Sequence, residues 1–253
     1  MNKKEIKLFL DEKVELYNRP DFIVDDPILI PHKFSRKEDI EIAGFLASTI
    51  AWGQRKTILA NATRMLEFME WQPYLFLKEN EHNDFFYDGF VHRTFNSTDF
   101  EFFLRALKDL YANHGGLENA FSMGKNNFER IANFQQLFFN LDRVSVPDKS
   151  RKHVSNPNKN SACKRLNMYL RWMVRDDKKG VDFGIWKNIP MADLMLPLDV
   201  HTGNTSRKLG ILKRKQNDWK TVEEITSQLR KFDVVDPCKY DFALFGLGVA
   251  EKF

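Results

Sequence analysis

Cysteine is scarce in this sequence, since Cys163 and Cys238 are the only two among 253 residues. Two thiols are too few for a disulfide framework or a four-thiolate metal cluster. The six histidines are scattered, and no two of them have the spacing that would place metal ligands on one helix face. We therefore expect neither a bound metal nor another cofactor.

Apolar runs long enough to span a membrane are also missing. The charged N-terminal stretch MNKKEIKLFLDEK lacks the apolar centre of a signal peptide. We expect a cytoplasmic protein that makes no membrane contact. The motifs of several large enzyme classes are absent as well, namely His-Glu-x-x-His, Gly-x-Ser-x-Gly, the P-loop and Gly-x-Gly-x-x-Gly.

Sustained alternation of apolar and polar residues does not occur, which argues against an extensive sheet. Helical spacing dominates instead, and Thr98 and Glu101 form the capping pair of one predicted helix. Hydrophobic residues make up 43% of the chain, with 23 Phe, which is enough for one large or two small domains. The sequence therefore predicts an all-α protein.

Positive charge is concentrated between residues 143 and 175, where the net charge is +8 although the whole chain has only +4. The basic residues of this stretch are Arg143, Lys149, Arg151, Lys152, Lys159, Lys164, Arg165, Arg171 and Arg175. Helical spacing places Lys164, Arg171 and Arg175 along one stripe. Such a block is typical of proteins that bind a polyanion, and a solvated loop that binds nothing is the alternative.

A carboxylate stands at the start of a predicted helix in the stretch Pro197-Leu198-Asp199-Val200-His201-Thr202. A carboxylate at this position accepts backbone N–H bonds and is stabilised by the helix dipole. From spacing alone, Asp199 is interpreted as a helix N-cap.

The flanking residues add a second interpretation, because PLDVHTGNTSRKLG resembles the helix entry that holds the catalytic Asp of helix-hairpin-helix DNA glycosylases. Two other stretches follow that family's order. FLASTIAWGQR, residues 45–55, resembles the helix end that brings a Gln or Asn into the duplex, and NSACKR, residues 160–165, occupies the place of the hairpin and the helix after it. The segments KRLNMYLRWMVR, PLDVHT and DPCKYDFALFGLG are similar to an uncharacterised bacterial branch of the superfamily, related to archaeal 8-oxoguanine glycosylases.

The resemblance implies a two-lobed helical bundle with a cleft between the lobes. Within a single unit of residues 1–253, the lobes would cover roughly 35–145 and 160–253, with the N-terminal helix packed on the C-terminal lobe. It further implies a monomer that acts on double-stranded DNA containing a damaged base or an abasic site. The familiar Leu-Pro-Gly-x-Gly hairpin is replaced by Asn158-Lys159-Asn160-Ser161, and Asn tolerates the left-handed conformation that a tight turn requires.

The implied function is a DNA-repair N-glycosylase, with or without AP-lyase activity, that acts on a flipped damaged purine such as 8-oxoguanine. Asp199 would stabilise positive charge on the sugar. Lys164 would attack the sugar, since neighbouring cations lower the pKa of a lysine; a phosphate contact is its alternative role. His201 would orient a phosphate or the carboxylate, and a purely structural histidine is the alternative.

Further contacts follow from the same resemblance. Gln54, with Arg55, is expected to fill the gap left by the flipped base. The other expected DNA contacts are Asn160, Ser161, Arg165, Arg171, Arg175 and His201. The expected base pocket consists of Trp52, Trp172 and Trp186, with Asp182 at a base edge; each tryptophan is alternatively a core residue.

Two other functions stay open. One is a non-catalytic nucleic-acid-binding protein on the same scaffold. The other is a protein–protein scaffold whose basic loop docks an acidic partner. Steep salt dependence of binding would separate the nucleic-acid functions from the scaffold.

Overall fold

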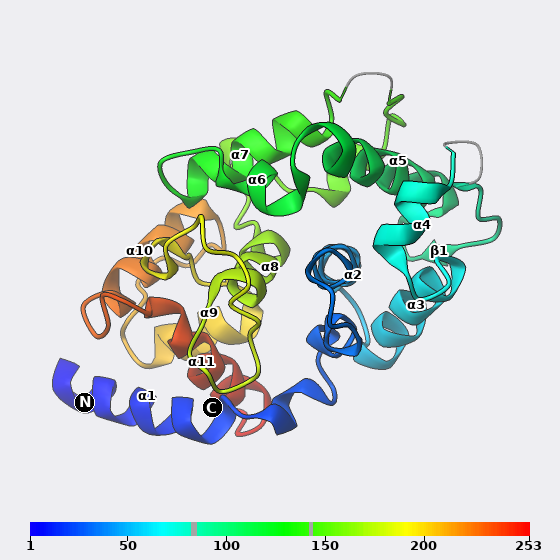
Figure 1. Ribbon diagram of the computed structural model, residues 1–253. Coiled ribbons are helices and arrows are strands. Elements are labelled where there is room, and N and C mark those ends of the chain that lie inside the picture. Colours follow the sequence, from blue (N-terminus) through cyan, green and yellow to red (C-terminus); the bar gives the residue numbers. More distant parts are fainter. Residues whose placement is uncertain (82–84, 142–143) are drawn as a thin grey trace. The chain divides into compact units, whose positions relative to one another are not determined.

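The computed structural model describes residues 1–81, 85–141 and 144–253, and helices dominate it (Figure 1). The only strands in these ranges are β1 (Val91–His92) and β2 (Phe95–Asn96), which form one antiparallel hairpin. The prediction of an all-α protein is therefore confirmed. The chain divides into two compact units: unit 1 combines Met1–Val24 with Asn156–Phe253, and unit 2 is Asp25–Ser155.

Unit 2 is a helical domain with a core rich in phenylalanine. Phe45, on one helix, meets the rings of Phe103, Phe134 and Phe138 at centroid distances of 5.8, 5.5 and 5.6 Å, and such aromatic contacts add to the gain from burial. Its helices are α2 (Lys37–Thr49), α3 (Arg55–Phe68), α4 (Pro73–Glu79), α5 (Ser97–Asn113), α6 (Gly116–Ser122) and α7 (Asn127–Phe138), with 3-10 turns η2 (Pro27–Leu29), η3 (Pro31–Lys33) and η5 (Ser150–His153).

The capping pair of α5 differs from the predicted one. The N-cap is Asn96, whose Oδ1 accepts the Asp99 N–H at 3.2 Å, while Asp99 Oδ2 accepts the Asn96 N–H at 3.1 Å. The box lies two residues before the predicted Thr98 and Glu101 because Asn96 leaves β2 with extended dihedral angles and the helix starts directly after it. Asn serves the N-cap at least as well as Thr, and Asp99 here takes the place that Glu usually has at the third helical position.

Unit 1 is built around α11 (Tyr240–Val249), which packs against α1 and α9. Gly246 allows the close approach to α1, since a Cβ at this position would lie 2.3 Å from the Tyr17 ring. The other helices are α1 (Lys3–Tyr17), α8 (Lys164–Val174), α9 (Val200–Lys208) and α10 (Trp219–Leu229), with 3-10 turns η1 (Pro20–Ile23), η6 (Pro157–Lys159), η7 (Met191–Asp193) and η8 (Pro237–Lys239). These helices bring the starts of α8 and α9 to one place.

Candidate functional site

Asp199 is the N-cap of α9, as its position in the sequence predicts. Its Oδ1 accepts the N–H of Thr202 at 2.9 Å. The preceding Leu196 is buried and its N–H donates to Thr226 Oγ1 at 3.1 Å, which fixes the approach of the chain to the helix. The cap bond occupies one carboxylate oxygen and leaves the other available.

That second oxygen faces the ammonium group of Lys164. The distance from Lys164 Nζ to Asp199 Oδ2 is 3.9 Å, which is an ion pair without a direct hydrogen bond. The side chains of Lys164 and Asp199 are 32% and 20% exposed, so both remain accessible to a ligand. The first residue of α8 and the N-cap of α9 therefore form a partly open pair of opposite charges.

The turn before α8 is tight and is anchored to α10. Asn160 has φ +57° and Cys163 has φ +47°, so both adopt the left-handed conformation. Asn160 Nδ2 donates to Asp218 Oδ2 at 3.2 Å, and Asn160 O accepts the Trp219 N–H at 3.3 Å. Asn160 thus adopts the left-handed conformation expected of it in a tight turn before α8, and Ser161 and the half-buried Arg165 flank it.

Asp241 on α11 is a further acidic group of this site that sequence reasoning did not find. Its carboxylate is buried and accepts a hydrogen bond from Arg171 Nη1. Burial, together with the negative charge of Asp199, raises the pKa of Asp241 to about 6, although Arg171 and Lys164 act in the opposite direction. The Lys164–Asp199 pair therefore stands in the field of a third, buried carboxyl group.

Replacing Asp241 with asparagine is expected to flatten the pH dependence of stability. A carboxyl group whose pKa rises on folding stabilises the protein at low pH, and this contribution is lost as the pH rises through about 6. The shift corresponds to about 2–3 kcal/mol. Urea unfolding between pH 4.5 and 7.5 would measure it: the wild type should lose stability relative to Asp241→Asn as the pH rises. A parallel pair of curves would contradict the assignment.

Arg171 and Arg175 belong to a buried network of ion pairs. Arg171 Nε donates to Asp182 Oδ1 at 3.2 Å, and Arg175 Nη1 donates to Asp182 Oδ2 at 3.0 Å. Arg175 Nε also donates to both oxygens of Asp236 at 3.0 Å. This corrects the expectation that Arg171 and Arg175 contact DNA and that Asp182 reads a base edge, because their charged groups are enclosed and satisfy one another.

Trp172 and Trp186 are also interior residues, 0% and 1% exposed. The Trp186 ring meets Tyr169 edge to face at 5.3 Å. Their alternative role as core residues is therefore confirmed, and no base can stack on either ring. Trp172 lies on the buried side of α8, whereas Trp186 follows this helix in the chain and its N–H donates to Met173 O at 2.9 Å.

His201 lies in the first turn of α9 and is exposed. It lines a cavity of about 430 Å³ together with Asn204, Lys208 and Lys252. Thr205 also lines this cavity, and its buried Oγ1 has no hydrogen-bond partner in the described part of the chain. Cationic and hydrogen-bonding groups thus border a hollow beside the helix that Asp199 caps.

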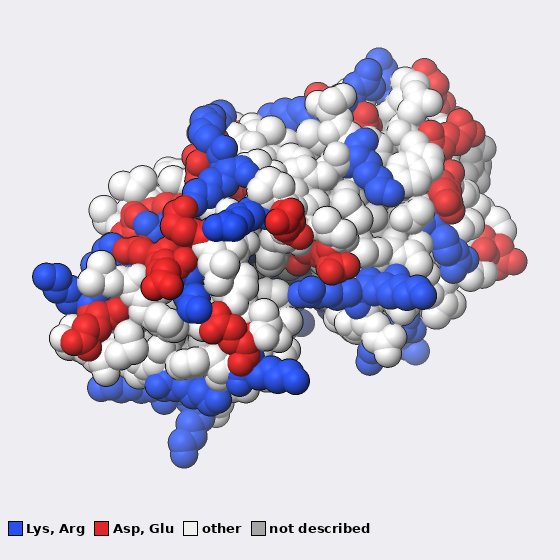
Figure 2. Space-filling model, turned by 90° about the horizontal axis from the view of Figure 1, so that it is seen from below, with Lys and Arg blue, Asp and Glu red and all other residues white. Residues whose placement is uncertain are grey.

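The basic stretch does not form one continuous basic surface. Arg143 lies outside the described residues, and Arg171 and Arg175 are internal. Arg151 is directed to its own unit, with Nη2 donating to Phe139 O at 3.3 Å. On the face seen in Figure 2, basic and acidic side chains are intermixed. The Lys164–Asp199 pair keeps Arg165 and the exposed Lys159 as basic neighbours in sequence.

In unit 2, the predicted DNA-contacting turn lies between α2 and α3. Gln54 is the N-cap of α3, and Gln54 and Arg55 are both exposed. Gly53 has φ +110°, a conformation that favours glycine. His92 holds the turn: its Nε2 lies 3.1 Å from Trp52 O, and Asn61 Nδ2 lies 2.9 Å from its Nδ1. Since the amide nitrogen can only donate, Nε2 is the protonated ring nitrogen that donates to Trp52 O.

A second histidine supports the same turn. The ring of His153 stacks on Trp52 at 5.9 Å, with an interplanar angle of 23°. His153 Nε2 lies 3.1 Å from Asp99 Oδ2, and Ser150 Oγ donates to Asp99 Oδ1 at 2.5 Å. Burial acts to raise the pKa of Asp99, but the hydrogen bonds from His153 and Ser150 outweigh it and lower the pKa. Trp52 is the one predicted base-pocket tryptophan with its ring partly exposed.

The chain is similar to one known protein family over most of its length. The model of one family, described as a protein of unknown function (DUF2400), matches residues 26–250. The chain belongs to the DUF2400 family. The matched range includes Lys164, Asp199, Asp241 and the turn at Trp52. No curated protein and no solved structure matches the chain.

Neither a cluster of metal ligands nor a membrane-spanning helix occurs within the described residues of this DUF2400 protein. No group of three or more His, Cys, Asp and Glu side chains within residues 1–81, 85–141 and 144–253 is placed to hold a metal ion. No helix in the same ranges is both long and apolar enough to cross a membrane.

Three functional candidates were missed from the sequence, namely Asp241, His92 and His153. An acid inside the apolar helix YDFALFGLGV was a usable signal, because an ionisable group in such a helix requires a partner. His92 and His153 had no such signal in the sequence, because they lie 61 residues apart and come together only in the fold, around Trp52.

Proposed function

We propose that this DUF2400 protein is a DNA N-glycosylase, with or without AP-lyase activity, that acts on a flipped damaged purine such as 8-oxoguanine. The observation that carries the proposal is the 3.9 Å approach of Lys164 Nζ to Asp199 Oδ2. These are the two side chains that the resemblance to helix-hairpin-helix glycosylases assigns to catalysis, and both are partly exposed.

Each group has a defined task in base excision. Breaking the N-glycosidic bond develops positive charge on the sugar, and a fixed carboxylate beside it lowers the barrier. Asp199 suits this task because its cap bond holds one oxygen while the other faces Lys164. In the bifunctional reaction, the neutral amine of Lys164 bonds to C1′ as the bond from C1′ to the base breaks. The base leaves with the bonding electron pair, and the proton lost by the amine neutralises it.

Double-stranded DNA is the proposed partner, bound by a monomer. The tight turn at Asn160 and Ser161 precedes an eleven-residue helix, and a helix N-terminus favours phosphate. Arg165 and the cationic hollow at His201 offer further phosphate contacts. Flipping a base costs on the order of a few kcal/mol. We propose that Gln54 offsets part of this cost by filling the gap, with Trp52 as a stacking surface.

Borohydride trapping on duplexes with an abasic site or 8-oxoguanine tests the proposal. The wild type is expected to form a covalent adduct, which Lys164→Ala should abolish because the attacking amine is gone. Lys159→Ala is the matched control, since it removes an exposed cation of the same stretch and should keep the adduct. Base release without an adduct would indicate a monofunctional glycosylase. Neither adduct nor base release from any duplex would overturn the proposal.

A further inference from the structure

Three aromatic side chains of unit 2 lie on α4, on α5 and just before α4, and two of them have a cation over the ring. Trp71 has the Lys33 ammonium 5.0 Å from its ring centroid, and Tyr74 has the Arg36 guanidinium at 5.9 Å. Tyr111 meets Tyr74 at 5.4 Å, with an interplanar angle of 67°. We call Trp71, Tyr74 and Tyr111, with their cations, the aromatic strip.

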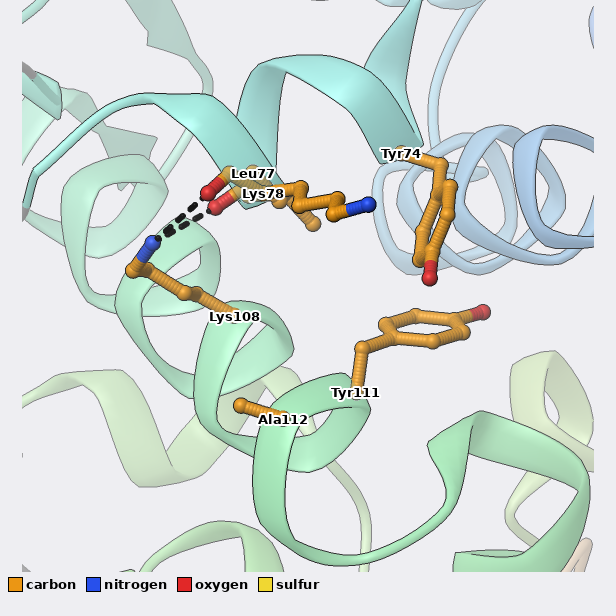
Figure 3. Close-up of a pocket in the computed structure, with 6 residues that line it drawn as sticks. All are labelled: Tyr74, Leu77, Lys78, Lys108, Tyr111 and Ala112. Carbon is orange, nitrogen blue, oxygen red and sulfur yellow. Dashed lines mark hydrogen bonds between the residues drawn. The ribbon is translucent and has the colours of Figure 1, made fainter.

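The strip includes a pocket of about 280 Å³ between α4 and α5. Figure 3 shows the Tyr74 and Tyr111 rings at its mouth, with the Lys78 ammonium directed toward Tyr74. Lys108 is not available to a ligand, because its Nζ donates to Leu77 O and Asn80 O, both at 2.9 Å.

Hydrogen bonds hold the side chain of Tyr111 and the backbone of Tyr74. Tyr111 OH donates to the buried Glu41 Oε2 at 2.6 Å, and the Tyr74 N–H donates to Asp39 Oδ1 at 2.8 Å. Lys78 is exposed and lines the same pocket. The pocket therefore offers aromatic surface beside an exposed cation.

Trp71 is presented by an unusual backbone. Glu70 and Trp71 have φ values of +53° and +55°, a conformation that bulky L-residues rarely adopt. The Trp71 ring nevertheless stays 36% exposed, more than Trp172, Trp186 and Trp219, which are nearly fully buried. A residue in a strained conformation whose side chain stays partly open to solvent suits a role in binding.

We propose that the aromatic strip binds single-stranded nucleic acid, separately from the proposed glycosylase site of unit 1. An unpaired base presents a planar face that stacks on an aromatic ring, whereas paired bases in a duplex do not. One base fits the pocket between Tyr74 and Tyr111, a neighbouring base stacks on Trp71, and Lys78, Lys33 and Arg36 neutralise phosphates.

Quenching of tryptophan fluorescence in the full-length protein tests the proposal, with a single-stranded DNA tetramer, the same sequence as a duplex, and adenosine 5′-monophosphate as probes. The single strand should quench the wild type and bind at least tenfold more tightly than the duplex or the mononucleotide. Trp71→Gly should lose most of the quenching and weaken binding about tenfold. Glycine suits φ +55°, so this change should not disturb the fold.

Lys78→Gln provides an independent test, because it removes an exposed charge without touching the core. The slope of log affinity against log salt should fall by about 0.7, as expected for one phosphate contact on a single strand. Lys125→Gln is the matched control: it removes an exposed lysine charge of unit 2 outside the aromatic strip and should bind as the wild type does. Unchanged binding by both Trp71→Gly and Lys78→Gln would overturn the proposal. So would equal affinity for the duplex, or for the mononucleotide alone.

The test of single-strand binding can be separated from the test of glycosylase activity in unit 1. Trp71→Gly should still form the borohydride adduct if Lys164 is a nucleophile. Lys164→Ala should still show the single-strand quenching if the aromatic strip binds as proposed.

Discussion

Asp199→Asn is expected to lower the rate of base release by at least about 100-fold. Asparagine is as good an N-cap as aspartate, so the bond to the Thr202 N–H and the start of α9 should persist. The negative charge, however, is lost. The sugar cation would then lack its stabilising carboxylate, and Lys164 would lack its only ion-pair partner in the described part of the chain.

Single-turnover release of the damaged base from a duplex measures this effect. Asp199→Ala removes both the charge and the helix cap. It should lose as much activity as Asp199→Asn and, in addition, about 1 kcal/mol of stability. Asp199→Asn should unfold at the wild-type urea concentration. A rate within a few-fold of the wild type would remove Asp199 from the mechanism and leave it as a helix cap alone.

The same variant distinguishes the functional alternatives. A glycosylase should keep its DNA affinity in Asp199→Asn while losing turnover. A non-catalytic nucleic-acid-binding protein would bind duplex DNA with an affinity that falls steeply as the salt concentration rises. It would show no turnover, either as the wild type or as Asp199→Asn. A scaffold for an acidic protein partner would show no preference for DNA over other polyanions.

Arg175→Met is expected to reduce the free energy of unfolding by about 3–5 kcal/mol, a large part of the stability of an ordinary domain. The Arg175 side chain is 1% exposed and pairs with Asp236, Asp182 and Asp177. Methionine fills much of the same volume but leaves the buried carboxylates without their counter-charge. The loss should appear as a lower midpoint in urea at pH 7.

Acid conditions provide an internal check on Arg175→Met. Burial acts to raise the pKa of Asp177, but Arg175 and its other partners hold it below the ordinary value. This carboxylate therefore stabilises the wild type above its unfolded pKa, and the contribution is lost as the pH falls. The difference between wild type and variant should shrink toward low pH. Lys178→Gln, which breaks an exposed pair with Asp176, should have no measurable effect.

Local features of the sequence were sufficient to predict the all-α fold class and the N-cap of α9. Helical periodicity depends on residues three or four apart, and an N-cap depends on a bond to an amide three residues later, so neither needs distant contacts. The left-handed backbone conformation of Asn160 was also predictable from the sequence, because tolerance of this conformation is a property of asparagine itself. The resemblance singled out Lys164 and Asp199 but could not place them.

Tertiary structure alone decided which charges face solvent and which pair. The helical spacing of Arg171 and Arg175 predicted a basic stripe on the surface of one helix. In the structure both side chains are buried and pair with the carboxylates of Asp177, Asp182, Asp236 and Asp241. Whether a cation binds phosphate or a buried carboxylate depends on partners up to 70 residues away, and local periodicity contains no such information. The same reason explains the meeting of Lys164 with Asp199 and of two histidines around Trp52: each requires the packing of separate helices and turns, which only the folded chain provides.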